Sequence, residues 1–183
     1  MIAPLPKIWI ITGDREAGKT SFCRQIILEA HSRGFSTAGV LSPAVFTQGV
    51  KTAIEVEDIA GGQKRLLAIL RNGVPDAITR RWKFDEEALK WGSKVLAEST
   101  PCDVLIVDEL GPLELEHNQG WIEGIQAIDT GKYLAALVVI RTELIITGQQ
   151  LWPRSGVISL ARTDSPEKIT QTTIQIFQAL NRR

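Results

Sequence analysis

The residues best suited to chemistry lie near the start of the chain, in the stretch Gly13-Asp14-Arg15-Glu16-Ala17-Gly18-Lys19-Thr20. Their spacing fits the pattern G-x-x-x-x-G-K-[ST], in which backbone N–H groups turn inward and bind phosphate oxygens. A helix that begins at such a loop adds positive potential. We therefore expect this stretch and Ser21 to bind a nucleotide, with Lys19 on its β- and γ-phosphates and the Thr20 hydroxyl on Mg²⁺.

The loop is unusual in carrying two carboxylates, those of Asp14 and Glu16, beside the place expected for an anionic ligand. Like charges repel at short range, so both side chains must point outward if the loop is to bind phosphate tightly. Arg15 lies between them and partly offsets their charge. The alternative interpretation of the whole stretch is a glycine-rich turn before a helix with a surface lysine.

A second pattern, Asp103-Val104-Leu105-Ile106-Val107-Asp108-Glu109, places two acids at the end of an apolar run. Such a run is typical of a buried strand, and ligands of open α/β sheets bind outside the carboxyl ends of strands. We expect Asp108 to hold the water shell of Mg²⁺ and Glu109 to polarise a water in line with the γ-phosphate. The alternative is that both acids are solvated residues at a strand end.

The second pattern continues as Asp108-Glu109-Leu110-Gly111-Pro112-Leu113-Glu114-Leu115, which resembles the signature D-E-[IL]-G-x-[LM]-E-L of the small nucleoside-triphosphatases first described from thermophiles. That resemblance implies a RecA-like sheet and Mg²⁺-dependent hydrolysis of ATP, GTP and other nucleoside triphosphates with a loose base preference. The chain departs from the family in two places. The family's loop is usually rich in Gly and Pro where this chain has Asp14 to Ala17. The basic residues that the family carries after the stretch beginning at Gly39 are reduced here to Lys51.

Arginines and one further acid are candidates for the same site. Arg141 follows the apolar run 134–140, where it could stabilise transition-state charge or be an ordinary surface residue. Other arginines compete for that role: Arg80, Arg81, Arg154 and Arg162. Glu114 could position water, or it could cap a helix, because Gly111-Pro112 forces a turn just before it.

Three more features have weaker signals. Residues 161–164 follow a short apolar run and could contact the base of a nucleotide. Trp152 could stack on that base or pack in the core. Cys23 lies on the apolar stripe of a predicted helix and is expected in the core, whereas Cys102 is a weak candidate for a reactive thiol.

The elements between these motifs predict the fold class. Apolar runs with little alternation predict buried parallel strands at 7–12, 104–108 and 134–140. Helical spacing or start signals predict helices at 20–33, at 85–99 and from 165 onward, and more weakly at 118–129 and 142–150. Residues 36–70 break this alternation and indicate an inserted antiparallel β excursion. We expect one α/β domain over residues 1–183, with the three-layer P-loop NTPase fold and a RecA-like, mostly parallel sheet.

Composition excludes some function classes. Twenty-one Lys plus Arg balance 21 Asp plus Glu, which argues against an electrostatic grip on DNA or on a membrane. No apolar run reaches the ~18 residues of a membrane span, and residues 1–7 do not read as a signal peptide. Two distant cysteines, Cys23 and Cys102, suit a reducing compartment, so we expect a cytoplasmic protein. A protein partner or self-association stays open.

The leading hypothesis is a Mg²⁺-dependent enzyme that hydrolyses ATP, GTP and related triphosphates to the diphosphate and phosphate. Lys19 and Arg141 would support the reaction that Glu109 performs as the base. A small-molecule or nucleoside kinase is one alternative, with Arg71, Arg80 and Arg81 in a lid. A nucleotide-binding adaptor with negligible turnover is the other, suggested by the acids in the loop.

Overall fold

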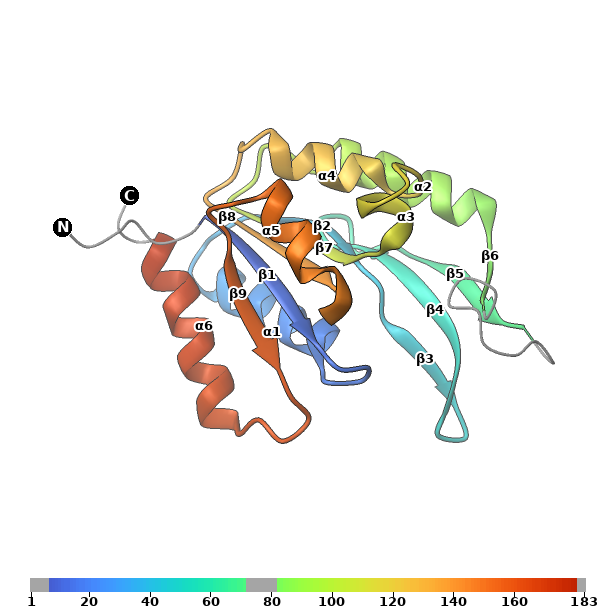
Figure 1. Ribbon diagram of the computed structural model, residues 1–183, viewed down its shortest axis with the longest axis horizontal. Coiled ribbons are helices and arrows are strands. Elements are labelled where there is room, and N and C mark those ends of the chain that lie inside the picture. Colours follow the sequence, from blue (N-terminus) through green and yellow to red (C-terminus); the bar gives the residue numbers. More distant parts are fainter. Residues whose placement is uncertain (1–6, 72–81, 181–183) are drawn as a thin grey trace.

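The sheet has nine strands within residues 7–71 and 82–180, the part of the chain that the computed structural model describes. Their order is β6-β5-β4-β2-β7-β8-β1-β9, with β3 paired to β4 (Figure 1). Five strands run parallel: β2 (Thr37–Leu41), β7 (Val104–Leu110), β8 (Ala135–Ile140), β1 (Ile8–Gly13) and β9 (Gly156–Leu160). Four are antiparallel: β3 (Ala44–Thr47), β4 (Val50–Asp58), β5 (Lys64–Leu70) and β6 (Trp82–Phe84).

Helices cover both faces of the parallel strands, as the lack of alternation in those strands predicts. On one face, α1 (Lys19–Ser32) and α6 (Pro166–Leu180) pack Ile26 and Phe177 into a core with Ile11 of β1. On the other face, α2 (Glu86–Ala97) and α4 (Ile122–Asp129) pack against the same sheet, and α5 (Ile145–Leu151) lies over Ile10 and Ile140. The predicted three-layer α/β architecture is confirmed (Figure 1).

The order of the strands places the two sequence motifs close together, at the carboxyl ends of the parallel strands. β1, which leads into the phosphate-binding loop, and β7, which ends in the acidic pair, are both parallel neighbours of β8. Val139 of β8 is in register with Ile11 on one side and with Asp108 on the other. The loop, the acidic pair and the residue after β8 therefore lie side by side at the carboxyl edge.

The antiparallel excursion begins later than the sequence analysis expected. β2 lies within the predicted range 36–70, but it is buried along its whole length and pairs in parallel with β7. The antiparallel part starts at β3, which the sequence did not predict, and β6 extends it beyond residue 70. The reason is physical: an apolar run buried on both faces suits the inner parallel strands, whereas the alternating positions of β4 suit a ribbon with one solvated face.

Local signals set several helix ends. The Asp85 carboxylate accepts a 2.8 Å hydrogen bond from the Ala88 amide and caps α2, and α1 ends just before Gly34, as predicted. The helix expected at 118–129 begins only at Ile122. The one expected at 142–150 is split into a 3₁₀ turn, η1 (Thr142–Leu144), followed by α5.

The structure bears on the expectation about membrane spans, but the described residues leave out some of the residues considered above. Among the helices they contain, none combines the length and the apolar character needed to cross a membrane. Residues 1–6, 72–81 and 181–183 lie outside the described residues, and these include Arg80, Arg81 and most of the N-terminal stretch tested above for a signal peptide.

Gly39 of β2 tests how closely this strand packs against its parallel neighbour β7. Its φ is +110°, and an added Cβ would lie 1.9 Å from the Ile106 carbonyl oxygen of β7. Gly39→Ala should therefore lower the free energy of unfolding by about 3 kcal/mol or more, from backbone strain and overpacking together. Urea denaturation measures this loss.

Gly49, in the turn between β3 and β4, is the matched control. It also has a positive φ, +78°, but an added Cβ would meet open space. Gly49→Ala should cost only the backbone term, about 1–2 kcal/mol. Equal losses in the two variants would contradict a role for Gly39 in the close approach of β2 to β7.

Candidate active site

The phosphate-binding loop connects β1 to α1, and its charged side chains lie at the surface. Asp14, Arg15 and Glu16 are all exposed. The Glu16 carboxylate accepts a 2.7 Å hydrogen bond from Arg162, which also donates to the Arg15 carbonyl at 3.1 Å. Both acids are thus at the surface, where Arg162 neutralises Glu16, but Glu16 also lines a cavity beside the loop.

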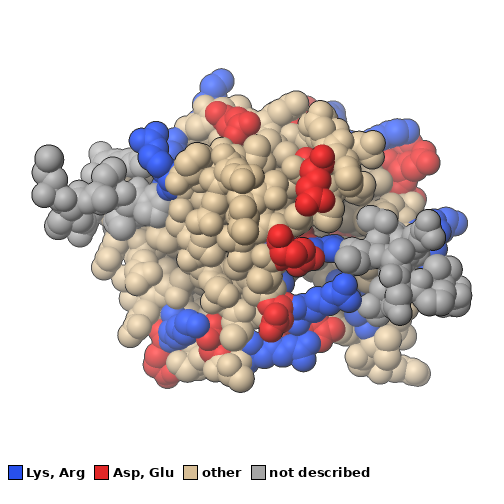
Figure 2. All heavy atoms as spheres, in the orientation of Figure 1, with Lys and Arg blue, Asp and Glu red and all other residues tan. Residues whose placement is uncertain are grey.

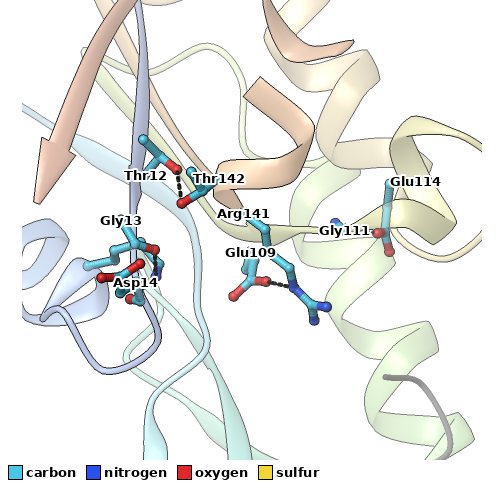
Figure 3. A network of polar contacts seen from close by, with 9 residues as sticks. Thr12, Gly13, Asp14, Glu109, Gly111, Glu114, Arg141 and Thr142 are labelled. Carbon is cyan, nitrogen blue, oxygen red and sulfur yellow. Dashed lines mark hydrogen bonds and ion pairs between the residues drawn. The ribbon is translucent and has the colours of Figure 1, made fainter. Parts of the chain in front are cut away.

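Lys19 folds back over the loop from the first turn of α1. Its Nζ donates to the carbonyl oxygens of Gly13 and Asp14, at 2.8 Å each (Figure 3). These contacts place the ammonium group on the loop itself rather than in solvent. The loop thus presents a cation together with the amides at the start of α1, which is a favourable environment for an anion.

Asp108 is the most deeply buried acid of the candidate site, with 2% of its surface exposed. The pKa of its carboxyl is raised to about 6, mainly by burial and less by the charge of Glu109, although hydrogen bonds from Thr20 and from the Ser42 amide act to lower it. The Ser42 amide lies 3.2 Å from Oδ2. Thr20 and Asp108, the two residues expected at the metal, are therefore brought together from α1 and β7.

Glu109 lies at an irregularity in β7. Asp108 is in register with Val139 of β8 and Leu110 with Ile140, so Glu109 has no partner on that strand. Such a bulge re-aims a side chain. Asp108 and Leu110 are buried, whereas the Glu109 side chain keeps 33% of its surface exposed.

Arg141 meets Glu109 directly. Its Nε donates to Glu109 Oε1 at 2.7 Å, as Figure 3 shows. The Nη1 atom of the same guanidinium is buried without a hydrogen-bond partner among the described residues. An unpaired buried donor is costly, so this nitrogen is a place where a ligand or a water could bind.

Ser42 and two threonines are site residues that the sequence analysis missed. Ser42 follows β2 and donates through its hydroxyl to the backbone carbonyl of Asp108, in addition to the amide contact described above. Thr12 of β1 is fully buried, and its hydroxyl lies 3.5 Å from that of Thr142, which begins η1. A polar residue directly after an apolar run was the available signal for Ser42.

Glu114 has a structural role, which was one of the two roles considered for it. It belongs to the short helix α3 (Pro112–Leu115), and its Oε2 accepts from the Gly111 amide at 2.8 Å. Its Oε1 accepts from the Trp121 amide at 3.1 Å, just before α4. Both oxygens are used as caps, and Figure 3 shows the side chain well apart from Glu109.

A cavity of about 350 Å³ flanks the loop between α1 and the segment after β9. Its lining includes Ser21, Gln25, Ala161, Arg162 and Asp164. The segment 161–164 therefore lies beside the loop, where a base contact was expected. Figure 2 shows charged side chains of both signs gathered around a hollow near this edge of the molecule.

Burial separates the weaker candidate residues from one another. Trp152 is buried and its Nε1 donates to Asp129 at 3.0 Å, so it packs in the core and is not available to stack on a base. Cys23 is in the core as expected, and burial raises its pKa well above the ordinary value. Burial also raises the pKa of Cys102 to about 11, which disfavours a reactive thiolate there. Arg154 and Arg71 are exposed.

The fold and the site together define a P-loop nucleotide-binding protein with a RecA-like strand order, in which one strand separates the phosphate loop from the acidic pair. The chain belongs to the family described as NTPase, whose sequence pattern matches residues 8–156. This confirms the resemblance noted from the acidic motif.

Relatives and solved structures agree with that family. A protein named nucleoside-triphosphatase THEP1 from Methanopyrus kandleri is 28% identical over 115 residues, and the match covers 62% of this chain and 63% of the relative's own length. The protein of the same name from Korarchaeum cryptofilum is 26% identical over 164 residues, covering 86% of this chain and 80% of that relative. The chain thus spans less than two thirds of the Methanopyrus protein.

Two solved structures share the fold. The solution structure of a human cancer-related nucleoside triphosphatase superimposes with a TM-score of 0.70 at 17% identity, covering 96% of this chain and 98% of that one. The crystal structure of THEP1 from Aquifex aeolicus gives a TM-score of 0.68 at 18% identity, covering 94% and 98%. The similarity extends over nearly the whole chain, excursion included.

The buried Asp108 carboxyl predicts a pH-dependent stability. Its pKa is higher in the folded chain than in the unfolded one, so ionisation opposes folding: the cost is absent below about pH 4 and complete above about pH 6. Without metal or nucleotide, Asp108→Asn should be more stable than the wild type at pH 7.5, by on the order of 3 kcal/mol. The gain should shrink as the pH approaches 4. Urea denaturation in a chelator measures both.

The exposed acid Glu98, at the end of α2, provides the control. Glu98→Gln should change the free energy of unfolding by no more than about 0.5 kcal/mol at either pH. A loss of stability in Asp108→Asn at pH 7.5 would contradict the burial cost assigned to Asp108.

Proposed function

We propose that this protein hydrolyses nucleoside triphosphates to the diphosphate and inorganic phosphate, with Mg²⁺ as cofactor. The observation that carries the proposal is the meeting of two motifs at one sheet edge, with Thr20 of α1 hydrogen-bonded to Asp108 of β7 and Glu109 beside them. Family membership supports the same reaction.

The loop and Lys19 bind the phosphates in this proposal. The backbone N–H groups at the start of α1 and the Lys19 ammonium supply positive charge. In the structure Lys19 donates to two loop carbonyls. Phosphate oxygens carry a full charge and are the stronger acceptors, so a bound triphosphate would take over these donors.

The residues near Asp108 fit Mg²⁺. This ion prefers oxygen ligands and is usually held by one or two carboxylates together with phosphates and waters. Thr20 and Asp108 offer that small set of oxygens. No group of three or more His, Cys, Asp and Glu that could form an all-protein site is found within residues 7–71 and 82–180. When bound, Mg²⁺ would neutralise charge on the phosphates.

Glu109 is proposed as the general base. It would accept a proton from a water whose oxygen attacks the γ-phosphorus, while the bond from that phosphorus to the bridging oxygen breaks and the diphosphate leaves. Its bulged position leaves it more exposed than Asp108, so a water can reach it. Asp108, which is buried and hydrogen-bonded to Thr20, suits the metal instead.

The nucleoside would occupy the cavity that flanks the loop. Arg162 and Asp164 on its rim are already engaged, with Glu16 and with Lys168 and the Ala161 amide. The other polar side chains of the lining are Ser21 and Gln25. So small a set of groups to read the edge of a base favours a broad base preference among ATP, GTP and the pyrimidine nucleotides.

Neither alternative gains a specific observation. The adaptor hypothesis rested on the acids in the loop, but these are exposed and Glu16 is paired with Arg162. Of the lid arginines of the kinase hypothesis, Arg71 is exposed at the end of β5, and Arg80 and Arg81 lie outside the described residues. Water remains the acceptor that Glu109 suits best.

Lys19→Ala should abolish phosphate release, because it removes the cation that the loop presents to the γ-phosphate. We expect a loss of at least about 100-fold in kcat/KM, on the scale of losing one transition-state donor. The assay is phosphate release from ATP, GTP, CTP and UTP with excess Mg²⁺. The exposed Lys90 of α2 is the control, and Lys90→Ala should retain the wild-type rates. Retained activity in Lys19→Ala would contradict the site.

Glu109→Gln separates chemistry from binding. The variant should bind ATP within about threefold of the wild type, while kcat falls by about 10²–10⁴, the usual contribution of a general base. Calorimetry measures the binding and a steady-state assay measures kcat. Glu87→Gln, an exposed acid on α2, should leave both unchanged. Undiminished turnover in Glu109→Gln would exclude Glu109 as the base.

A further inference from the structure

We infer that Arg141 is a positioning residue, which orients the Glu109 carboxylate toward the phosphate loop and acts on the reaction only through it. This inference rests on the proposed function, since it assigns Arg141 a place in that same site. It differs from the initial expectation that Arg141 stabilises transition-state charge by touching the phosphate.

The strand order places Arg141 where it can do this. β8 lies between β1 and β7, and Arg141 is the first residue after it. Next to it, Thr142 is tied to Thr12 of β1 by the hydroxyl contact. Arg141 is therefore anchored between the strand that carries the loop and the strand that carries the base.

The direction of the contact favours orientation over phosphate binding. In Figure 3 the Glu109 carboxylate lies between the Arg141 guanidinium and the loop residues Gly13 and Asp14. The Nε–Oε1 bond engages one carboxylate oxygen, so the other can accept a proton from water. A base held by a third group is the arrangement found in many activated catalytic sites.

A contribution to the stability of the fold does not by itself explain the ion pair between Arg141 and Glu109. Each side chain is 33% exposed, and ion pairs of that exposure contribute about 0–1 kcal/mol. Orientation is a different matter: a base must lie within hydrogen-bond reach of its water, and a displacement of about 1 Å can cost about 10²-fold in rate. The contact with Arg141 Nε is a direct hydrogen bond to the Glu109 carboxylate, so it restrains the direction in which that carboxylate points.

The experiment compares Arg141→Ala, Arg141→Lys and Arg141→Ala combined with Glu109→Gln. Arg141→Ala should lower kcat by about 10- to 100-fold with KM within twofold of the wild type. Arg141→Lys should restore part of kcat, because a lysine keeps the charge but not the fixed fork of donors. In the Glu109→Gln background, Arg141→Ala should change neither residual turnover nor the affinities for ATP and ADP by more than twofold.

Arg33→Ala is the matched control, since Arg33 forms an ion pair with Glu29 at the far end of α1. It should keep the wild-type kcat and KM. Thermal unfolding of each variant checks that the fold is intact.

Three outcomes would overturn the inference: an unchanged kcat in Arg141→Ala, an equal loss of turnover in the Glu109→Gln background, or a selective loss of ATP over ADP affinity there. The last would mean that Arg141 contacts the γ-phosphate, through Nη1. Absence of phosphate release from the wild type with all four nucleotides would instead contradict the proposed function itself, and with it any role of Arg141 in orienting a base.

Discussion

The parallel pairing of β7, β8 and β1 is the constraint on which the site depends. These three strands are buried on both faces by the helices that cover the sheet. Because they run parallel, their carboxyl ends all lie at the same end of the sheet. The phosphate loop, Arg141 and the acidic pair each follow one of those ends. Hydrogen bonds across the strands therefore set the relative positions of groups that are far apart in the chain.

The same packing makes ionisation of the Asp108 carboxyl costly in free energy. Asp108 sits at the end of a strand whose apolar residues are fully buried, and this raises the pKa of its carboxyl to about 6. Hydrogen bonds from Thr20 and the Ser42 amide compensate only in part. A buried carboxylate that is costly when ionised is one that gains most from a cation, so this cost and the proposed binding of Mg²⁺ would have one origin.

Much of this architecture could be predicted from local patterns. The loop, the acidic pair and the cap at Asp85 are short-range features, whose chemistry depends on residues a few positions apart. The excursion was harder to delimit, because β2 pairs in parallel with β7 on one side and antiparallel with β4 on the other, and no local pattern records such a change of direction. Trp152 illustrates the same limit: the sequence left base stacking and core packing open, and the structure buries the ring, with its Nε1 donating to Asp129.

By itself, the sequence determined that a phosphate-binding loop and a buried acidic strand end occur in one chain, since both depend on spacing that neighbouring residues impose on the backbone. Only the tertiary structure decided which strand lies between them. Strand order follows from long-range packing of helices on both faces, which no local pattern records. That order brings Arg141 into contact with Glu109, which lies 32 residues earlier in the chain. It also brings Ser42, which follows β2, to the carboxylate of Asp108 in β7.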